Sequence, residues 1–191
     1  MMTEITTELR RTSAESAWLA RYYAVRGGFS LAWVAAALTV GPMSPLVAGI
    51  LLVGYPTWDA VANIADAQRA GGLRRNPTQA VNALVSAVTA LAVGVALTQG
   101  MHVVLAVFGA WAALAGVLQL ATALRRRRQA GSQWVMVLSG AQSAAAGAMF
   151  LAKAGGQATP SVADIAPYAA FGALYFLVSA GWLAVSLRRG R

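Results

Sequence analysis

Six apolar stretches, each long enough to form a membrane-crossing helix, alternate along the chain with short polar connections. They cover residues 22–40, 45–65, 78–97, 101–124, 133–152 and 165–187. A helix needs about 20 apolar residues to cross the hydrocarbon core of a bilayer. The pattern therefore predicts an all-α fold: a polytopic membrane protein with six transmembrane helices.

The basic residues indicate how these helices are oriented. If all six stretches span, fourteen of the fifteen lysines and arginines fall on one side and only Lys153 falls on the other. Basic residues near helix ends are retained in the cytoplasm during insertion. We therefore expect both termini in the cytoplasm, with a cytoplasmic segment at 1–21, the helix bundle at 22–187 and a basic tail at 188–191. The location implied is the bacterial inner membrane.

Composition removes several classes of protein. Hydrophobic residues make up 58% of the chain and charged residues 11%, which argues against a soluble domain. The absence of cysteine excludes disulfides and thiolate chemistry. The net charge of +9 arises from arginines at helix ends, so nucleic acid is not an expected partner. Residues 1–21 lack the apolar core of a signal peptide, and we expect a short amphipathic helix on the cytoplasmic surface.

The six stretches form three similar helical hairpins, at about 22–65, 78–124 and 133–187. A small residue stands second and serine fifth in RGGFS (26–30), NALVS (82–86) and SGAQS (139–143), and the even stretches share a glycine at 54, 109 and 172. Such recurrence indicates a threefold internal repeat. Small residues let helices approach closely in lipid. Those expected at helix contacts are Gly109, Ala113, Gly116, Gly140, Ala144 and Gly147.

Residues 106–154 show a family resemblance. They combine Gly109 and Gly116 on an even stretch, a basic loop, Trp134, and then Gly140 and Gly147 on an odd stretch. This pattern resembles the HdeD-like family of small six-span bacterial membrane proteins, which are built from a short repeated hairpin of unknown function. The resemblance implies a fold and an inner-membrane location, and no catalytic residues.

Two charged residues lie inside apolar stretches, Arg26 in the first and Asp59 in the second. Each would cost about 2.5–3.5 kcal/mol at the bilayer centre, so each is expected to have a partner. Because the first hairpin makes the two stretches neighbours, we expect Arg26 and Asp59 to pair. The pair is either a structural lock or part of a ligand site.

Further polar residues are predicted to lie close to Asp59. Asn63 and Asp66 follow on the same helix face, and Asn82 lies at similar depth on the third stretch. The predicted candidates for a ligand site or ion pair are therefore Arg26, Asp59, Asn63 and Asn82. Any site is expected in the cytoplasmic half and away from His102, because the outer half of every span is almost wholly Ala, Val, Leu and Gly.

No catalytic motif, metal-binding cluster or cofactor motif is found, so we expect no enzyme activity, no metal and no cofactor. The run of Arg125, Arg126, Arg127 and Arg128 is expected to contact anionic lipid headgroups. Three functions stay open. The first is a non-enzymatic stress-related or scaffold protein that self-associates. The second is a small transporter or channel with a polar pocket around Arg26 and Asp59, and the third is a lipid-modifying enzyme.

Overall fold

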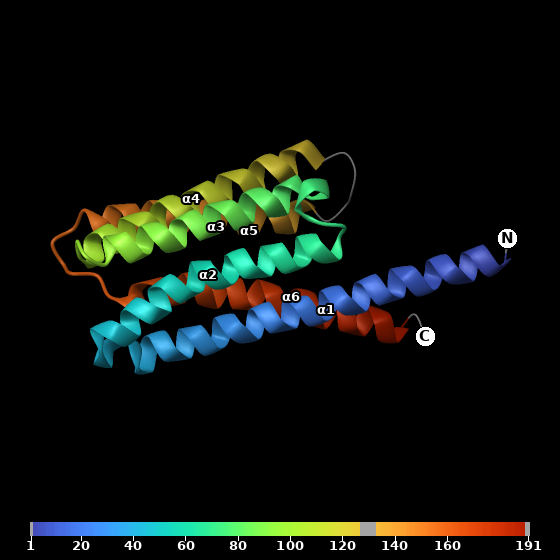
Figure 1. Cartoon of the computed structure of the whole chain (residues 1–191), viewed down its shortest axis with the longest axis horizontal. Helices are drawn as coiled ribbons and strands as arrows, with labels where there is room; N and C mark the ends of the chain where they lie inside the picture. The colour runs from blue at the N-terminus through green and yellow to red at the C-terminus, as the bar shows by residue number, and fades with distance from the viewer. Residues whose placement is uncertain (1, 127–132, 190–191) are drawn as a thin grey trace. The chain divides into compact units, whose positions relative to one another are not determined.

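The computed structural model describes residues 2–126 and 133–189, with side chains at 14–121, 124 and 137–189. Its helices are α1 Met2–Thr39, α2 Pro45–Arg69, α3 Pro77–Ala96, α4 Met101–Arg126, α5 Gln133–Ala154 and α6 Ala166–Arg189 (Figure 1). Three 3-10 turns lie between them, η1 Gly41–Met43, η2 Leu73–Arg75 and η3 Val162–Ile165. No strand occurs in the residues described, which confirms the all-α class. One long helix coincides with each predicted stretch.

The helices have the length and composition of membrane spans. Within the described residues, five stretches qualify, namely 14–43, 45–69, 77–96, 101–121 and 162–189. Helix α3 shows the inverted amphipathicity expected in lipid: Ala83, Ser86 and Ala90 are buried, whereas Leu84 and Leu91 are largely exposed. The chain is therefore a multi-pass membrane protein by structure as well as by sequence.

The N-terminal segment does not form a separate helix. Helix α1 continues without a break from Met2 to Thr39, which is 38 residues or about 57 Å at ~1.5 Å per residue. This length exceeds the ~30 Å hydrocarbon core. The expected short surface helix is thus replaced by an extension of the first span, which reaches past the end of α6 in Figure 1.

The chain divides into two compact units. One contains residues 1–35 and 169–191, which are most of α1 and α6, and we call it the two-helix unit. The other, the four-helix unit, contains residues 36–168, with α2 to α5. In the two-helix unit, Gly27 of α1 packs on α6, where an added Cβ would lie 2.7 Å from Leu177 Cγ and 3.3 Å from the carbonyl oxygen of Ala173.

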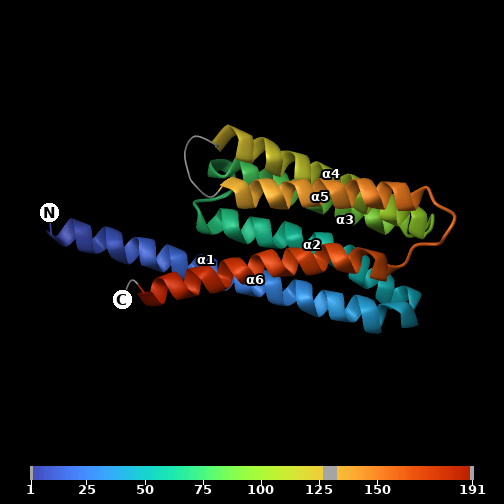
Figure 2. The same cartoon turned by 180° about the vertical axis from the view of Figure 1, so that it is seen from behind.

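Helices α4 and α5 form the closest pair of the four-helix unit, and they run side by side in both views (Figures 1 and 2). A Cβ added to Gly116 would lie 2.6 Å from the Gly140 carbonyl oxygen. One added to Gly147 would lie 2.7 Å from the Gly109 carbonyl oxygen and collide with the backbone of Ala113. All six small residues predicted for helix contacts therefore lie in this seam, because the backbones meet where side chains are absent.

Helix α2 packs mainly on α3, and α3 packs less extensively on α4. Hence the closest pairs described in this unit, α2–α3 and α4–α5, join one predicted hairpin to the next. The sequence had suggested that partners within a hairpin would be the natural neighbours. Short connections bring consecutive helices together, but they do not decide which neighbour packs more closely.

Helix α3 begins at Pro77, one residue before the predicted stretch, because proline is favoured at the first helical position. The side chain of Asn76, however, makes no N-cap hydrogen bond. Instead, its Nδ2 donates to the carbonyl oxygens of Ala70 and Gly72, each at 2.9 Å. These carbonyls follow the last turn of α2, where acceptors lack helical partners. Asn76 thus fastens the α2–α3 turn.

The core of the four-helix unit toward the η1 and η3 end is aromatic. Trp111 meets Tyr55, Phe108 and Tyr168 edge to face, with ring centroids 6.1, 5.9 and 6.2 Å apart. Phe150 meets Tyr168 in the same manner at 6.0 Å. We call these five residues the aromatic cluster. The prediction that the outer half is almost wholly Ala, Val, Leu and Gly did not anticipate this cluster, because its rings are spaced far apart in the sequence and converge only in the fold.

The same end carries one ion pair. Lys153, at the end of α5, binds Asp164 Oδ1, while Asp164 Oδ2 accepts a hydrogen bond from the Ser161 backbone N–H at 2.6 Å. Val162 and Ile165 of η3 are buried beside this pair. The one basic residue expected outside the cytoplasm is thus neutralised by a neighbouring carboxylate.

Candidate functional site: a polar seam between α2 and α3

The centre of the site is the Asp59 carboxylate, near the middle of α2. Its Oδ2 accepts hydrogen bonds from Ser86 Oγ of α3 at 2.7 Å and from Asn63 Nδ2 at 3.0 Å. Asn63 Nδ2 also donates to the Asp59 backbone carbonyl at 2.8 Å. Ser86 and Asn63 are buried, at 1% and 7% exposure, while Asp59 keeps an intermediate exposure. The carboxylate is therefore held in place by two donors from two helices.

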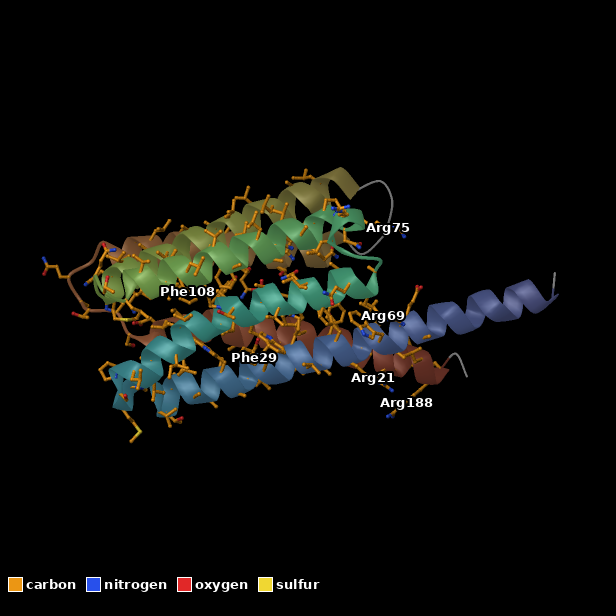
Figure 3. The ribbon with its side chains drawn as sticks, in the orientation of Figure 1. Arg21, Phe29, Arg69, Arg75, Phe108 and Arg188 are labelled. Carbon is orange, nitrogen blue, oxygen red and sulfur yellow. The ribbon has the colours of Figure 1, made fainter. Side chains whose placement is uncertain are left out.

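One end of the four-helix unit carries Arg69 and Arg75 (Figure 3), and we call it the basic end. A second polar contact lies nearer to this end. There, Gln79 Nε2 donates to Asp66 Oδ2 at 3.1 Å. Asp66 and Asp59 are seven residues apart on α2, and their partners Gln79 and Ser86 are seven residues apart on α3. The two helices therefore keep one antiparallel register. That register places Asn63 opposite Asn82. Asp59 and Asp66 both bond to α3, and Asn63 bonds to Asp59, so residues 59, 63 and 66 share a face as predicted.

The same register continues toward the aromatic cluster. It places Pro56 opposite Thr89, which is buried and donates its hydroxyl to the Val85 carbonyl at 2.8 Å. Pro56 lies inside α2, and having no N–H, it leaves the Leu52 carbonyl without its helical donor. Polar groups thus line α2–α3 from Asp66 to Pro56. We call this line the polar seam.

The repeat explains one member of the seam that the sequence did not single out. The fifth-place serines Ser30, Ser86 and Ser143 are all buried, at 3%, 1% and 8% exposure. Ser143 Oγ donates to the Ala112 carbonyl of α4 at 2.9 Å, and the Tyr168 hydroxyl lies 3.1 Å from it. Ser86 occupies the equivalent place but donates to Asp59. The sequence identified serine at the fifth place of each repeat but did not single out Ser86. The signal that could have identified Ser86 as a site residue is this repeated serine on the helix next to the one that carries Asp59.

Arg26 belongs to the two-helix unit. Its guanidinium carbon lies 4.3 Å from the ring centroid of Phe176 on α6 and 5.8 Å from that of Tyr22. Its Nη1 donates to the Tyr22 hydroxyl at 3.2 Å. This surrounding accommodates a cation in an apolar span. Because Arg26 and Asp59 are described in different units, their pairing stays a prediction.

Asn82 is partly buried at its register position, and His102 lies partly exposed in the first turn of α4, away from the polar seam. Arg127 and Arg128 lie outside the described residues, and so do the side chains of Arg125 and Arg126. Their predicted lipid contact is therefore untested. Within the described part of the chain, no group of three His, Cys, Asp or Glu residues is placed to hold a metal ion.

The polar seam can perform limited chemistry. Ser86 and Asn63 hold the Asp59 carboxylate by hydrogen bonds. An ionised carboxylate in a membrane interior attracts a proton or a cation, and such residues commonly mark ion and substrate pathways. The arrangement can therefore hold a proton or a cation at Asp59.

These features define a multi-pass α-helical membrane protein with one polar seam in its interior. Residues 81–152 match the family model described as "Short repeat of unknown function (DUF308)". The match runs from α3 through α4 into α5, and it is consistent with the HdeD-like resemblance, a family built on this repeat. It includes Ser86 and the glycine seam of α4–α5, whereas Asp59 lies outside it.

No curated protein and no solved structure matches the chain.

Proposed function

We propose that this protein is a small transporter of the bacterial inner membrane, non-enzymatic and HdeD-like, which passes a cation by way of the polar seam. The observation that carries the proposal is the Asp59 carboxylate, kept at mid-helix by Ser86 and Asn63 and still partly exposed. A charge at this depth is expensive, and its usual use is to bind something that crosses the membrane.

The order of groups along the seam supports the direction of entry. Asp66 and Gln79 lie nearest the basic end, Asn63 and Asn82 follow, and Asp59 with Ser86 comes next. A cation entering from the basic end would meet carboxylate or amide oxygens at each step. Beyond Pro56, buried residues such as Leu52 and Val93 are apolar, so the polar groups of the seam lie only on the side toward the basic end.

Flux through reconstituted protein tests the proposal. Liposomes containing the purified protein would be given a step in external pH, or in the concentration of sodium, potassium or an organic cation such as tetramethylammonium, and the charge movement recorded on a solid-supported membrane. We expect a current with at least one of these ions and its loss in Asp59→Asn. Ser143→Ala, a serine change at the equivalent place in α5, is the matched control and should keep the current. Currents of equal size in wild type and Asp59→Asn would refute the proposal.

We further propose six spans in three hairpins, with both termini in the cytoplasm. The arginines of the basic end and the neutralised Lys153–Asp164 pair at the other end support this orientation. The chain has no cysteine, so single cysteines can be introduced without background. Cysteines at Gln99 and Gly156 should react with a membrane-impermeant maleimide from outside the cell, and a cysteine at Gly71 should not. The reverse pattern would overturn the orientation.

A scaffold is the second candidate, and the α4–α5 seam favours it. Two helices whose backbones meet at four glycines form a rigid element with no room for a ligand. If rigidity is the function, a cellular phenotype should depend on Gly116 and be indifferent to Asp59→Asn. A transporter would show the opposite dependence on Asp59.

A further inference from the structure

The polar seam ends at the aromatic cluster, and the two share one face of α2. Tyr55 stands four residues before Asp59, which places it one helical turn away on the same face. Its ring meets Trp111 of α4 at a centroid distance of 6.1 Å and an interplanar angle of 82°. A carboxylate thus lies one turn from a group of buried rings.

We propose that the ligand taken at Asp59 is a lipophilic organic cation, such as a quaternary ammonium or phosphonium ion, and that Tyr55 and Trp111 supply the ring faces that bind it. This inference rests on the proposed function and names its substrate class. The carboxylate supplies the counter-charge, and the rings supply an apolar surface with a negative face.

The edge-to-face geometry of the cluster supports a cation. In such a contact, the positively polarised edge of one ring lies against the negative face of the other. A bound cation provides a stronger form of the same interaction. It can therefore replace the contact between Tyr55 and Trp111 once Tyr55 changes rotamer.

The chemistry of the seam disfavours a bare metal ion. Hard cations need six or more oxygen ligands, or near-ideal octahedral geometry. At Asp59, both donors already point at Oδ2, and no cluster of three acidic or histidine side chains accompanies it in the described residues. A quaternary cation needs no such shell, because it has no coordination sites to fill. The same chain already holds one cation against a ring, Arg26 over Phe176 at 4.3 Å.

Paired probes of similar shape and opposite charge test the inference. Equilibrium dialysis of the purified protein in detergent micelles would compare tetraphenylphosphonium with tetraphenylborate. We expect saturable binding of the phosphonium alone. Asp59→Asn should weaken it by about tenfold or more, and Trp111→Leu by roughly 3- to 30-fold. Tyr55→Phe should keep it, because the ring and not the hydroxyl is required.

Trp182→Leu is the matched control, since Trp182 is 75% exposed on α6 and lies outside the cluster. Size-exclusion profiles identify any variant that fails to fold. If Trp111→Leu fails to fold, a comparison of phosphonium binding by Tyr55→Phe and Tyr55→Leu decides whether an aromatic ring is required. Equal binding of both probes, or phosphonium binding unchanged in Asp59→Asn, would overturn the inference. An Asp59-dependent current with protons or alkali cations but no phosphonium binding would overturn it while leaving the proposed function intact.

Discussion

Two helix pairs in the four-helix unit share a geometry and differ in chemistry. In α4–α5, the contacts Gly109–Gly147 and Gly116–Gly140 are seven residues apart on each helix. In α2–α3, the contacts Asp66–Gln79 and Asp59–Ser86 have the same spacing. One pair is closed by backbone contact and the other by polar side chains. The two pairs thus share a contact spacing, while the residues at the contacts decide whether the interface is dry or able to bind.

The reason lies in the face that each even helix turns to its partner. The α4 face toward α5 carries Gly109 and Gly116, but their equivalents on α2 are not packed in the same way: a Cβ added to Gly54 meets nothing within 4 Å, and Val61 is 52% exposed. Instead, α2 turns Asp59 and Asp66 toward α3. The α2–α3 pair is therefore held by hydrogen bonds to side chains, and it acquires groups that can be exchanged for a ligand.

The largest expected effect comes from filling the glycine seam. In Gly116→Ala, the new Cβ would lie 2.6 Å from the Gly140 carbonyl oxygen, so the helices must separate. We expect a loss of about 1–3 kcal/mol in the free energy of unfolding, as for other overpacked cores. Thermal unfolding of the purified protein in detergent measures it.

Gly54→Ala is the control for this change, because Gly54 is the repeat equivalent of Gly109 on α2 and nothing lies within 4 Å of its added Cβ. It should be neutral or slightly stabilising, since alanine is favoured over glycine in a helix. If both changes lowered stability equally, the contrast between the two pairs would be wrong.

The glycine seam was predictable from the sequence for a physical reason. Gly109, Gly116, Gly140 and Gly147 recur at helical spacing, and in lipid close packing is what small residues provide. The helix positions followed from hydropathy in the same direct way. These features depend on local sequence alone.

A second, smaller difference is expected between equivalent serines. Ser86→Ala removes a donor to a carboxylate, whereas Ser143→Ala removes a donor to a backbone carbonyl. Hydrogen bonds to charged groups contribute about 1.5–3 kcal/mol and neutral ones about 1 kcal/mol. Thermal unfolding should therefore show Ser86→Ala as the more destabilising. Equal losses would indicate that Asp59 and a carbonyl are interchangeable acceptors here.

The contents of the polar seam were only partly predictable. Asp59 and Asn63 followed from helical spacing, but Ser86 required knowing which α3 residue faces Asp59, and that depends on the register between helices. The aromatic cluster was missed for the same reason, because Tyr55, Trp111 and Phe150 lie on three helices. Long-range contacts leave no periodic trace in a single sequence.

A third prediction concerns the contact nearest the basic end. Asp66 and Gln79 are both partly exposed, so water can replace their hydrogen bond at 3.1 Å. Interhelical contacts of this kind average about 0.6 kcal/mol. A double-mutant cycle with Asp66→Asn and Gln79→Ala should give a coupling energy of about that size. A coupling above ~1.5 kcal/mol would show that this contact is shielded from water.

The smallest effect on stability is expected at Asn82, and it separates a pathway from a merely structural seam. Asn82 faces Asn63 in the α2–α3 register, yet Asn63 Nδ2 already donates both to the Asp59 carboxylate and to the Asp59 carbonyl. Asn82→Ala should therefore change the free energy of unfolding by no more than about 0.5 kcal/mol, as is usual away from buried networks. Its effect on flux should be larger, because Asn82 lies between Asp66 and Asp59 on the proposed route. A stability loss matching that of Ser86→Ala would make Asn82 a structural member of the seam, and an unchanged current would remove it from the route.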